Sequence, residues 1–478
     1  MDILDLDAVD LVALIRQGKA SAVEVMQQTL SRVAAVNPKH TAIVSMADTD
    51  TILHAARAQD AQADKSGALF GLPLAVKDLS NAQGFPTSMG SAAFPMKPAD
   101  QDDLFVARMR AAGANIFGKT NTPEFGLGSH TFNPVHGTTS NAYDTTRSAG
   151  GSSGGAAVAL ATRMVAIADG SDMMGSLRNP AGWNNVYGMR PTWGLVPSEP
   201  LGDTFGQQLA TNGPMARSPR DLALLLGVQS GPDPRQPHGR TAQDFLTDMQ
   251  SHSLSGARIG YLGSWELPTE PGIMEITQDA VQNLENLGAR VDVVDAPFDM
   301  DALWQAWTTL RHWAVCAGLF ALYDNPTTRD LLKPAAVWEI ENGLKLSVID
   351  IHRASVIRSQ WYMRAAALFD TYDAVILSSA QTWPFDKTWV HPTDINGVAM
   401  DTYHRWMQVV IPAGLIGLPV VNLPIGFGET GLPAGMQLIG AKGSDARLLG
   451  YAQDWHVAHP YTQTAPAILS GRGQGLDL

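Results

Sequence analysis

The sequence predicts an α/β protein in which helices cover both faces of a sheet. Short, continuously apolar runs alternate along the chain with helical patterns, as expected of strands that are buried on both faces. The chain of 478 residues is 45% hydrophobic and only 17% charged, against about 25% charged in an average globular chain. A chain of this kind can bury a large core, which excludes a disordered protein.

The amino-terminal part of the chain is predicted to be helical. Residues 7–17 carry apolar side chains at helical spacing. Ser21 and Glu24 form a capping box for a second helix, which we expect to run to about Ala35 and to end because of Pro38.

Strands and further helices are then expected to alternate. The strand-like runs are 41–46, 72–76, 115–117, 165–168, 258–262, 290–294, 374–377 and 435–439. Helical patterns include 104–112, 272–287, 299–323 and 445–457. Residues 229–243 are rich in glycine, proline and polar side chains, which predicts a surface connection between two halves.

One stretch, residues 409–427, is nearly as apolar as a membrane span, with Asn422 as its only polar side chain. Its prolines, Pro412, Pro419 and Pro424, would break a spanning helix, so we predict buried loop and strand instead. The acidic first five residues lack the basic region that opens a signal peptide. We therefore expect a cytoplasmic protein that does not bind a membrane.

Charge and cysteine content narrow the function further. The 33 Lys and Arg against 46 Asp and Glu give a net charge of −13, which argues against a nucleic-acid partner. Cys316 is the only cysteine, so an internal disulfide is excluded and a reducing compartment fits. No histidine–carboxylate cluster has zinc-site spacing, so we expect neither a metal nor an organic cofactor.

The densest chemical signal is the glycine-rich segment 148–155, which is followed by an alanine-rich helix and by residues 169–181. Glycines let the backbone approach a ligand closely. The segment could hold a phosphate at a helix start, or form a nucleophile elbow, since 150–154 fits G-x-S-x-G. It could also supply hydroxyl groups in a different serine hydrolase. The phosphate interpretation is weak, because the sequence contains no G-x-x-x-x-G-K-[ST] motif and no G-x-G-x-x-G motif that follows a strand.

The two serine-hydrolase interpretations need different bases. An elbow serine at Ser152 needs an acid and a histidine nearby; of the eight histidines that follow, His391 and His404 are the least implausible. The other interpretation is favoured by Lys77, which ends an apolar strand-like run. Burial lowers the pKa of a lysine by up to about 3–5 units, so a buried lysine is a usable base near neutral pH.

Several of these stretches, in the same order, resemble the amidase signature family. The matching segments are 71–78, 118–125, 150–155, 171–181, 188–192, 417–419 and 431–440. The resemblance spans about residues 5–460 and is strongest in 70–200. It implies a single α/β/α domain over 1–478 around a mixed, mostly parallel twisted sheet. Within that domain it implies N-terminal helices in 1–65, a catalytic core in 66–228 and a variable helical substrate-pocket region in 300–370.

The resemblance also implies a Ser–Ser–Lys catalytic triad. Lys77 matches the family's base, Ser152 matches the bridging serine that follows a cis peptide bond, and Ser176 matches the nucleophile that forms an acyl-enzyme. The backbone of Met173, Met174, Gly175 and Ser176 matches the oxyanion hole. Asp172 and Arg178 flank the nucleophile and are expected to pair.

Met174 departs from the family, which usually has glycine at this position. A left-handed backbone there would cost on the order of 1 kcal/mol, so either the backbone is right-handed or the hole is shifted. We also expect Met174 to narrow the acyl side of the pocket.

The expected substrate is a small-molecule amide with an apolar or aryl part. Gly126 matches a position where the family's backbone faces the substrate, and Trp304, Trp307, Trp383 and Phe385 fall where the family places pocket walls. The resemblance also makes a homodimer possible.

Four alternatives stay open. The same triad could hydrolyse carbamates or esters, and the chain could be an A-type subunit of a glutamyl-tRNA amidotransferase. It could also be an α/β-hydrolase that uses Ser152 with a histidine. A binding or scaffolding protein without catalysis is disfavoured, because all three triad positions are filled.

Overall fold

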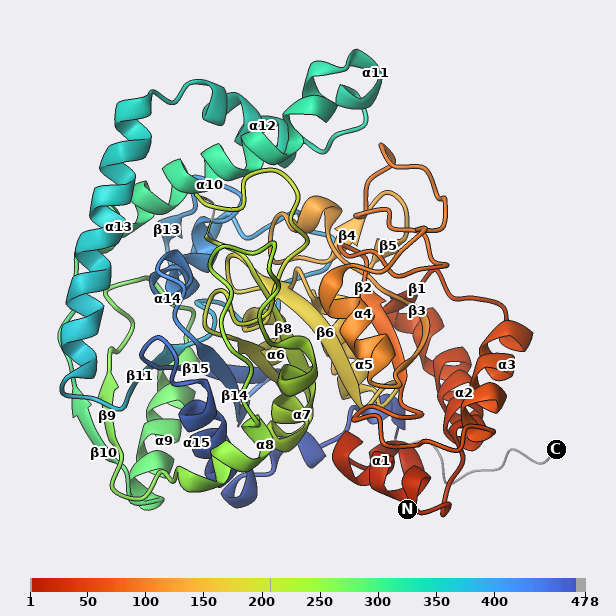
Figure 1. Ribbon diagram of the computed structural model, residues 1–478. Helices are drawn as coiled ribbons and strands as arrows, with labels where there is room; N and C mark the ends of the chain where they lie inside the picture. The colour runs from red at the N-terminus through yellow and green to blue at the C-terminus, as the bar shows by residue number, and fades with distance from the viewer. Residues whose placement is uncertain (1, 207, 470–478) are drawn as a thin grey trace.

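The computed structural model describes residues 2–206 and 208–469 of the chain (Figure 1). An eight-stranded sheet forms its centre. In spatial order the strands are β10 (Arg290–Val293), β9 (Arg258–Tyr261), β11 (Ala374–Ser378), β15 (Pro433–Ile439), β14 (Val420–Phe427), β7 (Tyr187–Arg190), β8 (Thr211–Ala216) and β6 (Ile167–Asp172).

The direction of these strands corrects one expectation. The α/β class and the mixed sheet are confirmed, but the sheet is not mostly parallel. Among the described residues of this sheet, only β10–β9 and β9–β11 pair in parallel, and its other neighbouring strands are antiparallel. The connection from β14 to β15 shows the reason: it is a short turn over residues 428–432, which is too short for the crossover that parallel neighbours need.

A smaller sheet lies beside the large one and carries the predicted lysine. Its strands, in spatial order, are β1 (Ile43–Val44), β3 (Asn115–Thr120) and β2 (Pro73–Lys77). β2 and β3 are parallel, with Lys77 opposite Thr120. Two short ribbons complete the strands: β4 (Phe132–Asn133) with β5 (Gly137–Thr138), and β12 (Asp394–Ile395) with β13 (Val398–Ala399).

Helices surround both sheets (Figure 1). They are α1 (Ala8–Arg16), α2 (Ala22–His40), α3 (Thr49–Asp60), α4 (Leu104–Ala111), α5 (Gly154–Ala161), α6 (Asn179–Trp183), α7 (Pro219–Gln229), α8 (Phe245–Asp248), α9 (Ile273–Asn286), α10 (Met300–Asp324), α11 (Pro326–Arg329), α12 (Pro334–Leu344), α13 (Val348–Phe369), α14 (Ile411–Leu415) and α15 (Asp445–Ala458). The 3₁₀ helices are η1 (Ile3–Asp5), η2 (Glu124–Gly126), η3 (Met249–Ser251), η4 (Arg405–Val410) and η5 (Tyr461–Gln463). Among the described residues, no helix combines the length and the apolar character that crossing a membrane requires.

The second helix differs from its prediction at one end. The capping box of Ser21 and Glu24 is present, but α2 continues through Pro38. Pro38 lies in the last turn, where the N–H that it lacks removes only one bond before the helix ends. The side chain of Asn37 then accepts hydrogen bonds from the N–H groups of Ala42 and Ile43, which fixes the exit of the chain.

Helix α5 joins the two sheets. All of its residues are buried, and it contacts β1, β2 and β3 of the small sheet as well as β6 and β8 of the large one. Such close approach explains its glycines and alanines: a Cβ on Gly155 would lie 2.4 Å from the nitrogen of Asn121 and 2.5 Å from the carbonyl oxygen of Ala42. The amino-terminal end of α5 therefore lies where strands of both sheets meet.

Candidate active site

A cavity of about 210 Å³ contains two of the three predicted catalytic side chains. Its lining residues are Leu79, Phe125, Gly126, Leu127, Ser152, Ser171, Met173, Ser176, Ala210, Arg311, Val315, Gly318 and Leu319. Most of this wall is apolar, and Arg311 is the only charged side chain among these residues. Ser152 and Ser176 thus face one common space, although 24 positions separate them in the sequence.

Lys77 lies at the end of β2 with its ammonium group surrounded by hydroxyl groups. Its side chain is almost fully buried. Nζ lies 2.7 Å from the Oγ of Ser152, 2.8 Å from the Oγ of Ser153 and 3.0 Å from the Oγ of Ser171. Sequence reasoning did not single out Ser153 and Ser171, although both lie in the polar segments that bracket α5.

The environment of Lys77 favours its neutral form. Burial lowers the pKa of Lys77 to about 7, although the carboxylates of Asp169 and Asp172 act in the opposite direction. A large fraction of the amine is therefore uncharged near neutral pH. An uncharged amine in contact with a serine hydroxyl can accept its proton.

The loop that carries Ser152 is fixed by hydrogen bonds to its backbone. The peptide bond between Gly151 and Ser152 is cis. Ser129 contacts this loop twice, since its Oγ donates to the carbonyl oxygen of Gly151 and accepts from the N–H of the same residue. Thr131 donates to the carbonyl oxygen of Gly150 through both its N–H and its Oγ1.

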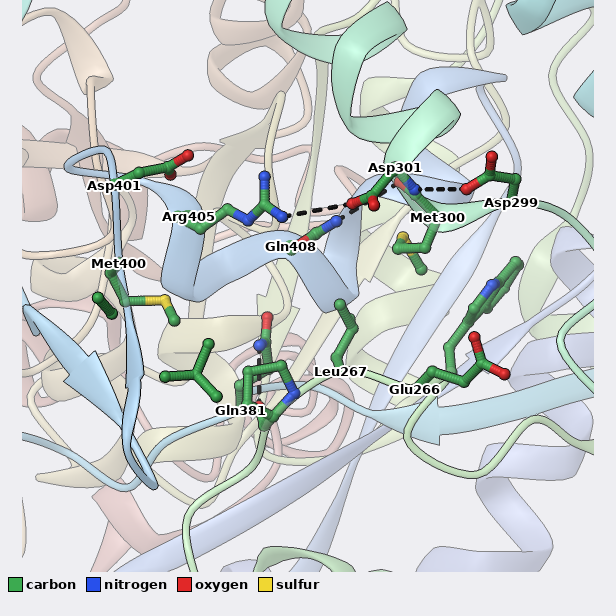
Figure 2. A pocket seen from close by; sticks show the side chains of 14 residues that line it. Glu266, Leu267, Asp299, Met300, Asp301, Gln381, Met400, Asp401, Arg405 and Gln408 are labelled. Atoms are coloured by element: carbon green, nitrogen blue, oxygen red, sulfur yellow. Dashed lines mark hydrogen bonds and ion pairs between the residues drawn. The ribbon is translucent and has the colours of Figure 1, made fainter.

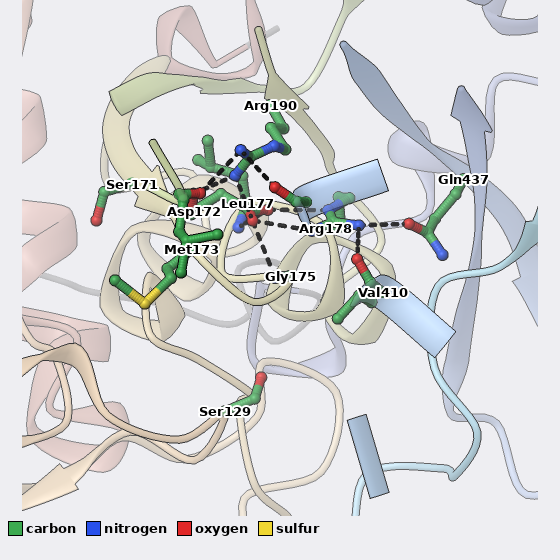
Figure 3. A network of polar contacts seen from close by, with 12 residues as sticks. Ser129, Ser171, Asp172, Met173, Gly175, Leu177, Arg178, Arg190, Val410 and Gln437 are labelled. Atoms are coloured by element: carbon green, nitrogen blue, oxygen red, sulfur yellow. Dashed lines mark hydrogen bonds and ion pairs between the residues drawn. The ribbon is translucent and has the colours of Figure 1, made fainter. Parts of the chain in front are cut away.

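A buried carboxylate organises the loop that carries Ser176 (Figure 3). The two oxygens of Asp172 accept from the N–H groups of Gly175 and Leu177, at 2.9 and 3.1 Å. They also pair with Arg178 at 2.9 Å and with Arg190 at 3.2 Å, which confirms the expected Asp172–Arg178 pair. Burial alone would raise the pKa of Asp172, but the two guanidinium groups more than offset this and hold its pKa well below its usual range.

The backbone around Ser176 distinguishes the four predicted oxyanion donors. The left-handed conformation falls on Gly175, with φ 80°, and not on Met174. The N–H of Gly175 is already used by Asp172, in contrast to its expected role. Within residues 2–206 and 208–469, the N–H groups of Met173, Met174 and Ser176 make no hydrogen bond to another residue.

Comparison with known proteins identifies the family of the chain. The family model described as Amidase matches residues 24–449. The chain belongs to the amidase family. It is 29% identical to an acylamidase of Rhodococcus erythropolis, with 97% of each chain covered. It is 31% identical to the A-type subunit of the glutamyl-tRNA(Gln) amidotransferase of Symbiobacterium thermophilum, covering 98% of this chain and 100% of that one. The solved structure of a bacterial aryl acylamidase of the amidase signature enzymes superposes with a TM-score of 0.90 at 27% identity, covering 98% and 99% of the two chains.

In this member of the amidase family, Met173 rather than Met174 lines the cavity. The side chain of Met174 is buried in a hydrophobic cluster that also contains Val410. The side chain of Met173 faces the cavity, and its sulfur lies 3.3 Å from Nη1 of Arg311. The expectation that Met174 narrows the pocket is therefore corrected in favour of its neighbour.

The predicted aromatic wall is also corrected. Trp304, Trp307 and Phe385 are buried in the hydrophobic cluster, and half-buried Trp383 donates its indole N–H to the carbonyl oxygen of Pro271. None of the four lines the cavity. Gly126 does line it, as the resemblance implied.

The positions of side chains along α10 explain why its two predicted tryptophans do not line the cavity. Trp304, Trp307, Arg311, Val315 and Gly318 follow one another at spacings of three or four residues, so they share one face of the helix. The amino-terminal part of this stripe packs into the core, whereas the part from residue 311 onward reaches the cavity.

The histidine alternative finds no support in this family member. His404 is fully buried; its Nδ1 lies 2.9 Å from the Oγ1 of Thr402, and burial lowers its pKa to about 3. The Nδ1 of His391 lies 2.9 Å from the carbonyl oxygen of Pro392. Neither histidine lines the cavity that contains Ser152.

A second cavity, of about 280 Å³, is lined by a different set of residues (Figure 2). Acidic side chains of Glu266, Asp299, Asp301 and Asp401 line it, and Arg405 pairs with Asp301 at 3.4 Å. It contains none of Lys77, Ser152 and Ser176. In the described part of the chain, no group of three or more His, Cys, Asp or Glu side chains is arranged to hold a metal ion.

Proposed function

We propose that the protein hydrolyses the carbon–nitrogen bond of small apolar or aryl amides, with Ser176 as nucleophile, Ser152 as proton relay and Lys77 as base. One observation carries this proposal: a buried lysine with a pKa of about 7 lies 2.7 Å from the hydroxyl of Ser152, which shares its cavity with Ser176. A serine hydroxyl becomes an effective nucleophile only when a base removes its proton.

The reaction follows from these positions. Neutral Lys77 accepts the proton of Ser152 while Ser152 accepts that of Ser176, and the Ser176 oxygen attacks the substrate carbonyl. The resulting oxyanion accepts hydrogen bonds from the free N–H groups of Met173, Met174 and Ser176. One good donor of this kind contributes roughly 3–4 kcal/mol to transition-state stabilisation.

Two proton transfers complete the turnover. Lys77 returns its proton through Ser152 to the leaving nitrogen, the carbon–nitrogen bond breaks and an acyl-enzyme remains on Ser176. A water molecule then loses its proton by the same route, attacks the acyl carbon and releases the carboxylic acid, so that Ser176 regains its hydrogen.

The cavity supports the substrate class. Its wall of leucine, valine, phenylalanine and methionine side chains suits an apolar acyl or amine group. The similarity to an acylamidase and to an aryl acylamidase supports the same class. Carbamates and esters share the acyl-enzyme chemistry and belong to the same test.

The test is a labelling experiment combined with a substrate panel. A fluorophosphonate probe should modify Ser176, as located by mass spectrometry, and Ser176→Ala should lose both the label and the hydrolysis of anilides. Ser359→Ala, an exposed serine on α13, serves as the control that keeps both. A label on Ser152 would instead contradict the assigned nucleophile.

A second candidate is the amidotransferase role, which the 31% identical relative from Symbiobacterium thermophilum favours. In that case isolated protein should release ammonia from glutamine more readily than it cleaves anilides. We propose anilides as the better substrates. Free glutamine carries both an ammonium and a carboxylate group, whereas Arg311 is the only charged side chain among the residues that line the cavity.

The proposal extends to a homodimer, as the sequence resemblance implied, and to a cytoplasmic location, as expected from the composition. Light scattering of the purified protein measures the oligomeric state, and cell fractionation measures the location.

A further inference from the structure

One charged group in the catalytic cavity has no part in the proposed proton relay. Arg311 extends from α10 into the apolar cavity, and its side chain is only 2% exposed. A cation in an apolar wall is costly unless it is paired and hydrogen-bonded. Its partners therefore define what it can still bind.

The guanidinium group is held on two of its three nitrogens. Nε donates to a carboxylate oxygen of Glu339 at 2.6 Å, and Nη2 donates to the hydroxyl of Tyr403 at 2.7 Å. Tyr403 in turn donates to the same oxygen of Glu339 at 2.5 Å. These bonds fix the plane of the guanidinium group, so the remaining nitrogen has a defined position.

That remaining nitrogen is weakly satisfied. Nη1 has two hydrogens, and its partner is the thioether sulfur of Met173 at 3.3 Å. A thioether is a weak acceptor. Since Arg311 and Met173 both line the cavity, a ligand there can offer Nη1 a stronger acceptor.

The charge balance indicates which acceptor fits. The carboxylate of Glu339 already neutralises Arg311, and the Nδ1 of His312 lies 2.5 Å from the other oxygen of Glu339. A second carboxylate would enter an apolar cavity without a free counter-charge, which is unfavourable. A neutral carbonyl oxygen needs only the one free donor.

We propose that Arg311 is a specificity-determining residue whose Nη1 donates a hydrogen bond to a neutral carbonyl oxygen of the substrate, remote from the bond that is cleaved. The favoured substrates are then apolar amides that carry a second, uncharged carbonyl group. This inference rests on the proposed function, because it uses the same cavity.

The experiment compares three p-nitroanilides of similar length. Their acyl groups are hexanoyl, which has no second acceptor, acetylbutanoyl, which ends in a ketone, and glutaryl, which ends in a carboxylate. A matched pair of N-pentyl and N-(oxopentyl) amides places the ketone on the amine side. For the wild type we expect kcat/KM on one ketone substrate to exceed that on its plain counterpart about tenfold, as for a hydrogen bond to a charged donor.

Variants then assign the preference to Arg311. Arg311→Lys and the double variant Arg311→Met/Glu339→Gln should lower the ratio to about one, and the double variant avoids an unpaired buried carboxylate. Met173→Leu should keep the ratio, because it removes only the competing acceptor. Arg405→Met, in the other cavity, is the distant control. A ratio that is unchanged in both Arg311 variants, or a preference for the glutaryl substrate, would overturn the proposal.

A binding measurement separates this proposal from the proposed function. Calorimetry of the same anilides with Ser176→Ala compares their dissociation constants without any turnover. If the wild type hydrolyses none of them while the ketone still binds about tenfold more tightly in an Arg311-dependent manner, the proposed function fails and the role of Arg311 stands. If ketone and plain amides bind equally tightly, whether the ketone is on the acyl side or on the amine side, the role of Arg311 is refuted and the proposed function is not affected.

Discussion

The backbone N–H of Lys77 donates to the carboxylate of Asp169, with 3.1 Å between nitrogen and Oδ1. Asp169 is fully buried beside the predicted base, and burial raises its own pKa to about 6. Above that pH its negative charge raises the pKa of Lys77 against the larger, opposite effect of burial. Asp169 thus helps to set the pH at which Lys77 becomes neutral.

The first prediction concerns the pH dependence of hydrolysis. Only neutral Lys77 accepts a proton, so kcat/KM should rise with pH and reach half its limit near pH 7. Asp169→Asn removes the charge that favours the ammonium form, so the midpoint should move to lower pH. Rates over pH 5 to 9 measure both, with exposed Asp330→Asn as the control. A midpoint that stays in place or rises in Asp169→Asn would contradict this account.

The second prediction uses two glycines near the cavity. A Cβ on Gly126 would lie 2.8 Å from a methyl group of Leu79 and 3.4 Å from the Oγ of Ser152. Gly126→Ala should therefore lower kcat/KM at least about tenfold. Gly128 also has a positive φ, but its Cβ would meet only the Tyr403 ring, at 3.6 Å. Gly128→Ala should lower the free energy of unfolding by about 1 kcal/mol and leave kcat/KM nearly unchanged. Equal kcat/KM values for the two variants would contradict the prediction.

The third prediction tests the turn before Ser176, the proposed nucleophile. Gly175 has φ 80°, and a Cβ there would lie 2.8 Å from Val410. Gly18 has φ 68° and open space around it. Gly18→Ala should lower the free energy of unfolding by about 1 kcal/mol from backbone strain alone. Gly175→Ala should lose a further 1–3 kcal/mol, roughly, from overpacking, together with turnover; urea denaturation and initial rates measure both.

The fourth prediction concerns the ion pair below Ser176. Arg178→Met leaves the fully buried carboxylate of Asp172 with Arg190 as its remaining guanidinium partner. Breaking a buried pair from one side typically costs about 3–5 kcal/mol. The pair of exposed Arg235 with half-buried Asp233 offers the control at the surface, because Arg235→Met should change stability by less than about 1 kcal/mol. Similar unfolding midpoints for the two variants would show that the network does not support the loop.

Local patterns predicted the elements of the fold better than their pairing. Continuous apolar runs such as 374–377 and 435–439 became β11 and β15, because local burial decides whether such a run forms a strand. The antiparallel pairing of these two strands depends on contacts between distant segments, which no local pattern contains. The end of α2 has a local explanation instead, because Pro38 lies in the last turn and the side chain of Asn37 accepts from the nearby N–H groups of Ala42 and Ile43.

Sequence reasoning singled out three polar side chains that the structure brings close together, but it misplaced the aromatic residues of the cavity wall. The glycine-rich segment and the strand-ending Lys77 were visible because their residue types are unusual for a core. The stripe of Trp304 and Trp307 was misleading, since one helical face serves both core and cavity, and the dividing point at Arg311 depends on tertiary packing. Arg311 was missed because an arginine within a helix carries no signal of burial.

The contact of α5 with both sheets has a practical consequence. The small sheet carries Lys77, the large sheet leads to the loop of the proposed nucleophile Ser176, and Ser152 precedes the helix between the two sheets. The rate of hydrolysis therefore also reports how closely the two sheets pack against α5. Mild heat or solvent that shifts the two sheets apart at α5 by a fraction of an ångström should abolish hydrolysis, while circular dichroism still records intact secondary structure.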